Sequence, residues 1–99
     1  MRIEMPEAIE IGGVTYRIEH DEKAVEYLKV KGWFGAQDAN EGWIRVDGSP
    51  HRVMETFLHE VVHAANYELA HAALDENSVS SISTGLTQVL KQLGVEIVV

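Results

Sequence analysis

The chain lacks cysteine altogether and has only two prolines in 99 residues. Without cysteine neither a disulfide nor a thiolate metal site can form, so a metal ion must be bound by histidine, carboxylate or backbone oxygen. No run of about eighteen apolar residues is present, and residues 1–6 lack the apolar segment of a signal peptide. We therefore expect a soluble protein located in the cytoplasm.

Basic residues are also scarce, because eight Lys and Arg stand against sixteen Asp and Glu, a formal net charge of −8. This balance argues against a nucleic-acid partner. Residues 53–99 contain a single basic residue, Lys91. One interpretation is a substrate of basic or neutral character; the other is a solvated acidic surface. The length and a hydrophobic content of 45% predict one globular domain covering residues 1–99.

The most informative pattern that is present is His59-Glu60-Val61-Val62-His63. On a helix, residues four apart lie one turn apart on the same face, so both imidazoles can reach one metal ion. Glu60 lies beside that pair, where it can reach a metal-bound water. Zinc lowers the pKa of such a water, and a carboxylate can accept its proton during attack on a carbonyl. The spacing therefore predicts zinc-dependent hydrolysis, usually of peptide bonds. The alternative is a helix whose histidines merely line a polar edge.

The flanking residues predict that this helix starts at Ser49-Pro50, with Ser49 as the N-cap and Pro50 at the first helical position. An apolar stripe faces the core, and His59 and His63 lie beside its edge. The stripe consists of Met54, Phe57, Leu58, Val61, Val62, Ala65 and Leu69.

A catalytic zinc usually takes three protein ligands, so one more is needed. Glu76 is the leading candidate, because Asp75 is the natural N-cap of the next helix and leaves Glu76 free in its first turn. Asp75 itself, Asn77 and His71 are further candidates, with His71 the first substitute. Glu76 also fits a simple role in complementing the helix dipole. Two histidines and a carboxylate suit iron(II) as well, although the adjacent Glu60 favours zinc.

This arrangement resembles the gluzincin pattern and is most similar to the small ImmA/IrrE-like metallopeptidases, including short phage-type and bacterial members. Residues 56–64 resemble their active-site helix, and residues 75–79 resemble their ligand-bearing segment. Residues 35–38 and 42–47 resemble the two strands that precede that helix. The likeness runs from about residue 9 to residue 93, but only the five-residue motif is specific.

The resemblance implies a zinc peptidase of minimal zincin-like fold, with His59, His63 and Glu76 as zinc ligands and Glu60 as general base. It also implies that the strand at residues 43–47 binds the substrate backbone as an added strand. Two rival functions stay open. One is a metal-binding interaction module of this fold without catalysis; the other is a metal-free structural protein, for example from a phage-derived gene cluster.

Four aromatic or histidine side chains have a functional and an ordinary interpretation. Tyr67 and His71 are candidates, by position alone, for stabilising the oxyanion, and Tyr67 is otherwise a half-buried surface residue. Trp33 and Trp43 either line a substrate cleft or make cross-strand and core contacts.

The fold class expected is α+β, with a small antiparallel sheet of two hairpins packed on the two helices that follow. Alternating apolar and polar residues predict the first hairpin at residues 8–11 and 14–18, joined by Gly12-Gly13. The second lies at residues 33–38 and 43–47. Residues 21–31 are interpreted as a short helix capped by Asp21, or as an irregular segment.

The C-terminal helix is unusual because residues 77–90 contain no charge. Its apolar stripe is expected to face the core, and Gly94 is expected to end the helix. That stripe comprises Val79, Ile82, Leu86, Val89, Leu90 and Leu93. The small polar residues on its other faces suggest a homodimer through this helix as one interpretation, and a plain neutral surface as the other.

Overall fold

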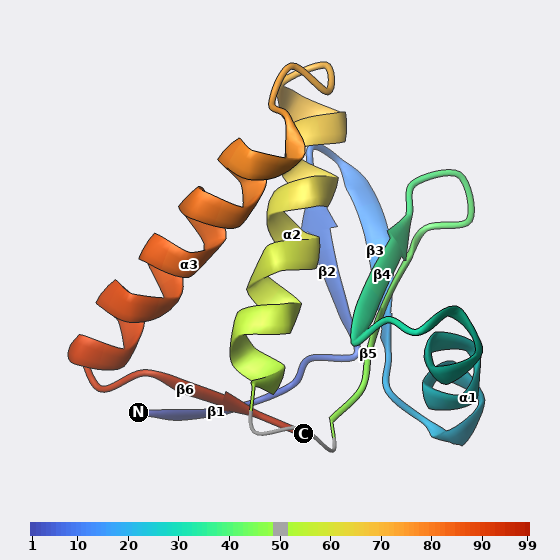
Figure 1. Ribbon diagram of the computed structural model, residues 1–99, viewed down its shortest axis with the longest axis horizontal. Helices are drawn as coiled ribbons and strands as arrows, with labels where there is room; N and C mark the ends of the chain where they lie inside the picture. Colours follow the sequence, from blue (N-terminus) through green and yellow to red (C-terminus); the bar gives the residue numbers. More distant parts are fainter. Residues whose placement is uncertain (49–51) are drawn as a thin grey trace.

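The computed structural model describes residues 1–48 and 52–99, which form an α+β fold (Figure 1). In chain order the elements are β1 (Arg2–Glu4), β2 (Ala8–Ile11), β3 (Val14–Glu19), α1 (Glu22–Lys31), β4 (Gly35–Asp38), β5 (Trp43–Val46), α2 (Val53–Leu69), α3 (Glu76–Gln92) and β6 (Glu96–Val98).

The elements lie in layers, with α1 on one face of a four-stranded sheet, α2 on the other face and α3 outside α2 (Figure 1). The strand order is β2-β3-β5-β4. Both predicted hairpins are confirmed as antiparallel pairs, β2–β3 and β4–β5. The prediction of a wholly antiparallel sheet is wrong at its centre, where β3 and β5 pair in parallel. The reason is α1, which carries the chain between the hairpins so that β5 enters beside β3 in the same direction.

The apolar core lies between the sheet and α2. Tyr16 and Ile18 of β3 and Ile44 and Val46 of β5 alternate inward to meet Phe57 of α2, and all five are at most 7% exposed. A smaller cluster on the other face packs Ala36 and Trp43 against Leu28 of α1. The sheet is therefore covered on both faces, and α2 is fixed against it.

Helix α2 begins at Val53, with Arg52 in the N-cap position and no side-chain hydrogen bond there. The predicted cap at Ser49-Pro50 lies outside the described residues. The predicted stripe is largely confirmed, with Met54 and Phe57 buried and its middle members partly buried. Its last member, Leu69, is 64% exposed because the helix runs past the sheet there.

The orientation expected for α3 is wrong for four of the six residues in its apolar stripe; Val79 is buried as predicted, and Leu90 is partly buried. The side chains it buries are Val79, Ser83 and Thr87, one turn apart, which face α2. The outward face carries Ile82, Leu86, Val89 and Leu93, each between 42% and 72% exposed. The helix also rests on α2 rather than on the sheet. Gly94 follows the helix with a left-handed φ of 83°, as expected for a stop.

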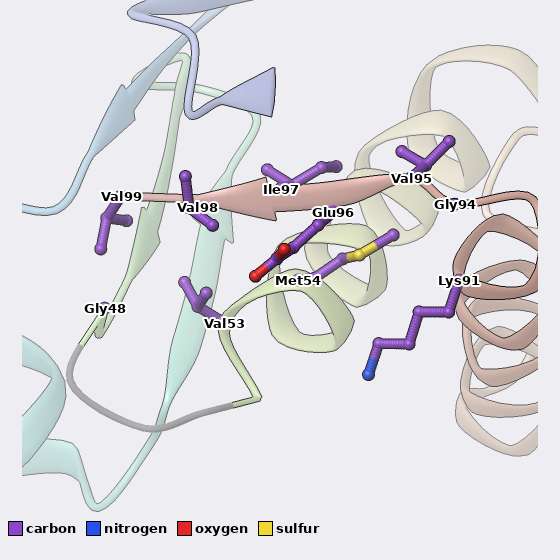
Figure 2. Close-up of a pocket in the computed structure, with 10 residues that line it drawn as sticks. All are labelled: Gly48, Val53, Met54, Lys91, Gly94, Val95, Glu96, Ile97, Val98 and Val99. Carbon is purple, nitrogen blue, oxygen red and sulfur yellow. The ribbon is translucent and has the colours of Figure 1, made fainter. Parts of the chain in front are cut away.

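The chain ends form a structure that the sequence did not predict, a parallel pair of β1 and β6. A hollow of about 640 Å³ lies along β6, with Val53 and Met54 of α2 among its lining (Figure 2).

The short helix predicted near residues 21–31 is confirmed as α1. It is capped as predicted, because the Asp21 carboxylate accepts from the backbone N–H of Ala24 at 2.9 Å. Among the described residues, no helix has the length and apolarity needed to cross a membrane.

Candidate metal centre

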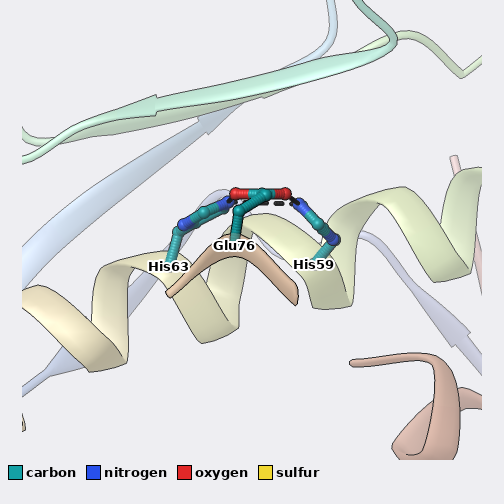
Figure 3. Close-up of side chains that lie close together, drawn as sticks. All are labelled: His59, His63 and Glu76. Carbon is teal, nitrogen blue, oxygen red and sulfur yellow. Dashed lines mark hydrogen bonds and ion pairs between the residues drawn. The ribbon is translucent and has the colours of Figure 1, made fainter. Parts of the chain in front are cut away.

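The three predicted ligands come together in the structure. The Glu76 carboxylate lies between the two imidazole rings of α2, with one oxygen 3.1 Å from His59 Nε2 and the other 2.9 Å from His63 Nε2 (Figure 3). The two Nε2 atoms are 3.1 Å apart. The two imidazole nitrogens and the carboxylate are therefore close enough together to hold one metal ion. Their proximity was expected from the sequence, although they come from two different helices.

The spacing of these atoms fits a small divalent ion. A tetrahedral zinc bound at about 2.0–2.1 Å separates its ligand atoms by about 3.3 Å. The two Nε2 atoms lie 3.1 Å apart, and each is 2.9–3.1 Å from a different oxygen of Glu76. Taken as one donor atom per residue the three lie within 4.8 Å of one another, so side-chain rotation is needed to bring them to the tetrahedral spacing. The Glu76 side chain is 65% exposed, so the point of convergence is open to solvent.

The contacts of Ser83 bear on which nitrogen of His59 carries the proton when the ring is neutral. Ser83 of α3 donates its single hydroxyl proton to the Ser80 carbonyl at 3.1 Å. Ser83 Oγ, 3.3 Å from His59 Nδ1, is then left to accept a proton from that nitrogen. A neutral His59 therefore carries its proton on Nδ1 and presents a lone pair on Nε2. This lone pair meets a carboxylate oxygen of Glu76, and two acceptors face each other unless a cation lies between them. A metal ion satisfies that requirement; in the other tautomer the Ser83 hydroxyl donates to Nδ1, and Nε2–H donates to Glu76.

The surroundings of His63 also favour a neutral imidazole ring. Burial lowers its pKa, His59 adds to that effect, and Glu76 opposes it. The pKa is lowered overall, so the neutral ring is favoured. Neutral imidazole is the form that binds a metal ion.

Glu60 lies beside the cluster but is held under the sheet. Its side chain is 8% exposed, and burial raises its pKa to about 7, with a smaller contribution from the charge of Glu76. Strand β4 passes close over it at Gly35, where a Cβ would lie 3.1 Å from Glu60 Cγ and 2.6 Å from Thr56 Cγ2. A glycine is therefore needed at this position for β4 to cover the carboxylate.

The connection between α2 and α3 determines where Glu76 lies. The Asn66 amide, one turn after His63, donates to the Leu74 carbonyl and accepts from the Leu74 N–H, both at 3.0 Å. Asp75 then caps α3 by accepting from the Ser78 N–H at 2.7 Å. The predicted cap is thereby confirmed, and Glu76 is free to reach the histidines.

The alternative ligand candidates are not part of the cluster. Asp75 is engaged by its capping bond, which lowers its pKa, and both Asn77 and His71 are exposed. Tyr67 is 54% exposed, and neither it nor His71 lines the two hollows that border the cluster. The two tryptophans have different surroundings. Trp33 lines both hollows, whereas Trp43 is a core residue with its ring edge-on to Tyr27.

Three residues of the site were not found from the sequence. Ser83 had a usable signal, since it follows Glu76 by seven residues and therefore lies on the same helix face. Asn66 and Gly35 act through contacts distant in sequence, and no local pattern marks them.

The prediction that residues 43–47 bind the substrate as an added strand is wrong. These residues form β5, which is already paired on both sides, by β3 and β4, so it has no free edge. The edge strand beside the cluster is β4.

No protein-family model, curated protein or solved structure matches the chain. The likeness to gluzincins therefore rests on the His-Glu-x-x-His motif and Glu76 alone, and it remains a prediction.

Proposed function

We propose that the chain is a zinc-dependent peptidase with His59, His63 and Glu76 as metal ligands and Glu60 as general base. The observation that carries the proposal is the convergence of two Nε2 atoms and a carboxylate beside a second, buried carboxyl group, that of Glu60. The proposal keeps the cytoplasmic location expected from the sequence.

The chemistry divides between the ion and the chain. When bound, zinc would act as a Lewis acid that polarises the scissile carbonyl and acidifies water. Glu60 accepts a proton from the attacking water as the new C–O bond forms. It then donates that proton to the amine nitrogen as the C–N bond breaks. Its position under β4 keeps the carboxylate in place between these two transfers.

The open edge of β4 offers a place for the substrate backbone. This strand ends the four-stranded sheet in the described chain, and it lies against α2 next to Glu60. An extended peptide can add to such an edge through main-chain hydrogen bonds. Gln37 of β4 lines the hollow that contains His63 and Glu76, and its buried Oε1 has no partner among the described residues.

The first test is the metal content of the purified protein. We expect about one zinc per chain, lost in His63→Ala and kept in His71→Ala, which removes an exposed histidine outside the cluster. Absence of metal from all three proteins after zinc is supplied would remove the proposal.

The second test separates catalysis from metal binding. Incubation with a peptide library should give cleavage by the wild type, whereas Glu60→Gln should keep its zinc and lose hydrolysis. Full activity in Glu60→Gln would refute its role as base.

A metal-binding module without catalysis is the second candidate. Tyr67 and His71 are the two candidate oxyanion donors, and neither of them lines the hollows beside the cluster, which favours this alternative. Stoichiometric zinc with no cleavage of any peptide in the library would support this alternative.

A further inference from the structure

A hollow of about 360 Å³ borders the metal cluster on the side of the chain that leads into β4. His59 and Glu60 form part of its wall, together with Thr56 one turn earlier on α2. The opposite part of its lining comes from Trp33 and Phe34, which directly precede the strand. The hollow is therefore continuous with the residues to which the proposed function assigns chemistry.

The two aromatic residues leave a large apolar surface exposed at this point. Trp33 is 50% and Phe34 is 59% exposed, and neither belongs to a core cluster of the described chain. Lys31 Nζ lies 5.9 Å from the centroid of the Trp33 ring, but packing of the core does not account for two adjacent large aromatic side chains here. Among the charged residues of the lining, Arg52 and Glu55 carry opposite signs, so the aromatic surface is the distinctive feature. Trp33 and Phe34 thus form one apolar wall of a hollow whose other side chains are polar or charged.

The direction of β4 shows which part of a substrate would reach the hollow. Gly35, at the start of the strand, lies against Thr56 and Glu60, and Gln37 shares a hollow with His63, further along α2. Strand β4 therefore runs in the same direction as α2. A peptide added antiparallel, the more stable arrangement, runs the opposite way. Its residues beyond the scissile bond then lie toward Trp33.

We propose that this hollow binds the large apolar side chain, aromatic or long aliphatic, of the substrate residue that follows the scissile bond. The inference rests on the proposed peptidase function and names its substrate class. Trp33 and Phe34 are the residues that determine specificity, because contact with them removes apolar surface of both partners from water.

The cleavage test uses peptides that differ only in the residue after the scissile bond. Wild type should cleave the phenylalanine peptide with a kcat/KM about tenfold above that for the alanine peptide. This ratio should fall toward one in Trp33→Ala and return in Trp33→Phe. The matched control is Val30→Ala, which removes an 80% exposed apolar side chain of α1 outside the hollow and should keep the ratio. A preference for alanine, no preference, or a preference on the preceding residue would overturn the assignment.

A binding measurement gives a readout that does not depend on turnover. Zinc-loaded protein is titrated calorimetrically with acetohydroxamate and with 3-phenylpropanohydroxamate, which share a zinc-binding group and differ in an aromatic side chain. The phenyl compound should bind about tenfold more tightly to wild type, and the difference should disappear in Trp33→Ala. Equal affinities would overturn the subsite while leaving the metal site intact. Failure to take up zinc or bind either compound would remove the proposed function and the subsite with it.

Discussion

At the scale of single residues, Ser83 is the side chain that orients a proposed metal ligand. Its hydroxyl connects the Ser80 carbonyl to His59 Nδ1, which leaves Nε2 to face Glu76. Groups that hold the second nitrogen of a metal-bound histidine typically contribute 10–100-fold to metal affinity. Ser83→Ala should therefore bind zinc about tenfold more weakly, whereas Ser83→Thr, which keeps the hydroxyl, should restore much of the affinity.

The measurement is competition for zinc against a chelator, with Ser81→Ala as the control because Ser81 is exposed on the same helix. Nitrogen-15 NMR of the histidine rings adds a test that a purely structural role would not pass. Wild type should show His59 protonated at Nδ1, and Ser83→Ala should shift that equilibrium. An Nε2-protonated His59 in the neutral wild-type protein would contradict this account.

Glu60 gives a prediction about folding stability in the metal-free protein. Burial raises its pKa from an ordinary value of 4.5 in an unfolded chain to about 7 in the folded protein. Below about pH 4.5 both states are protonated, so this group costs nothing. As the pH rises toward 7 the unfolded chain loses the proton first, so stability falls, and the loss is complete above about pH 7. The difference between the two pKa values corresponds to about 3 kcal/mol.

Glu60→Gln removes that titration and should stabilise the metal-free protein by up to about 3 kcal/mol at pH 8, with little effect at pH 4. Urea unfolding in the presence of a chelator measures both values. An equal gain at the two pH values would show that burial of the charge is not the cause.

At the scale of secondary-structure elements, the close approach of β4 to α2 depends on Gly35. A methyl group there would lie 2.6 Å from Thr56 Cγ2, so Gly35→Ala must move the strand away from the helix. We expect a loss of about 1–3 kcal/mol in the free energy of unfolding. Adding Thr56→Ser, which deletes the clashing methyl, should recover part of that loss.

The control for this prediction is Gly85→Ala on α3, where an added Cβ meets nothing within 4 Å. Alanine is the better helix former, so this variant should gain stability, by up to about 1 kcal/mol. Thermal or urea unfolding of the four proteins gives the comparison. If the double variant is no more stable than Gly35→Ala, the Thr56 contact is not the source of the strain.

Local sequence patterns predict individual hairpins and helix caps, but they do not predict how distant elements pair or which face a helix buries. The two hairpins and the caps at Asp21 and Asp75 depend on neighbours in sequence, and these predictions are confirmed. His59 and His63 also lie side by side as the spacing predicts, whereas their role as metal ligands stays a prediction. The parallel pairing of β3 with β5 depends on how the chain crosses at α1, which periodicity does not encode. Helix α3 was placed with its apolar stripe inward because burial of apolar surface usually decides. Val79 is buried as predicted, but Ser83 and Thr87 share its face toward α2 in place of Ile82 and Leu86, and Ser83 bonds to His59.

At the scale of the whole molecule, that reversed helix leaves an apolar face on an acidic protein. Ile82, Leu86, Val89 and Leu93 follow one another along the outward side of α3, and residues 77–90 are uncharged. Two copies that each carry a net charge of −8 repel one another over most orientations. This neutral face is where two copies can approach with the least repulsion, so we predict that self-association uses it.

We expect a weak dimer, because four side chains on one helix offer less than the area of about 800 Å² per partner found in stable interfaces. Sedimentation velocity should show association that increases with protein concentration. It should also strengthen at high ionic strength, since salt screens the repulsion while leaving the apolar contact intact. Val89→Lys should keep the protein monomeric, whereas Val30→Lys, on the exposed side of α1, should not. Because both variants add one positive charge, a difference between them isolates the α3 face from the change in net charge. A wild type that stays monomeric at every concentration and salt level would mean that this face is simply a neutral surface.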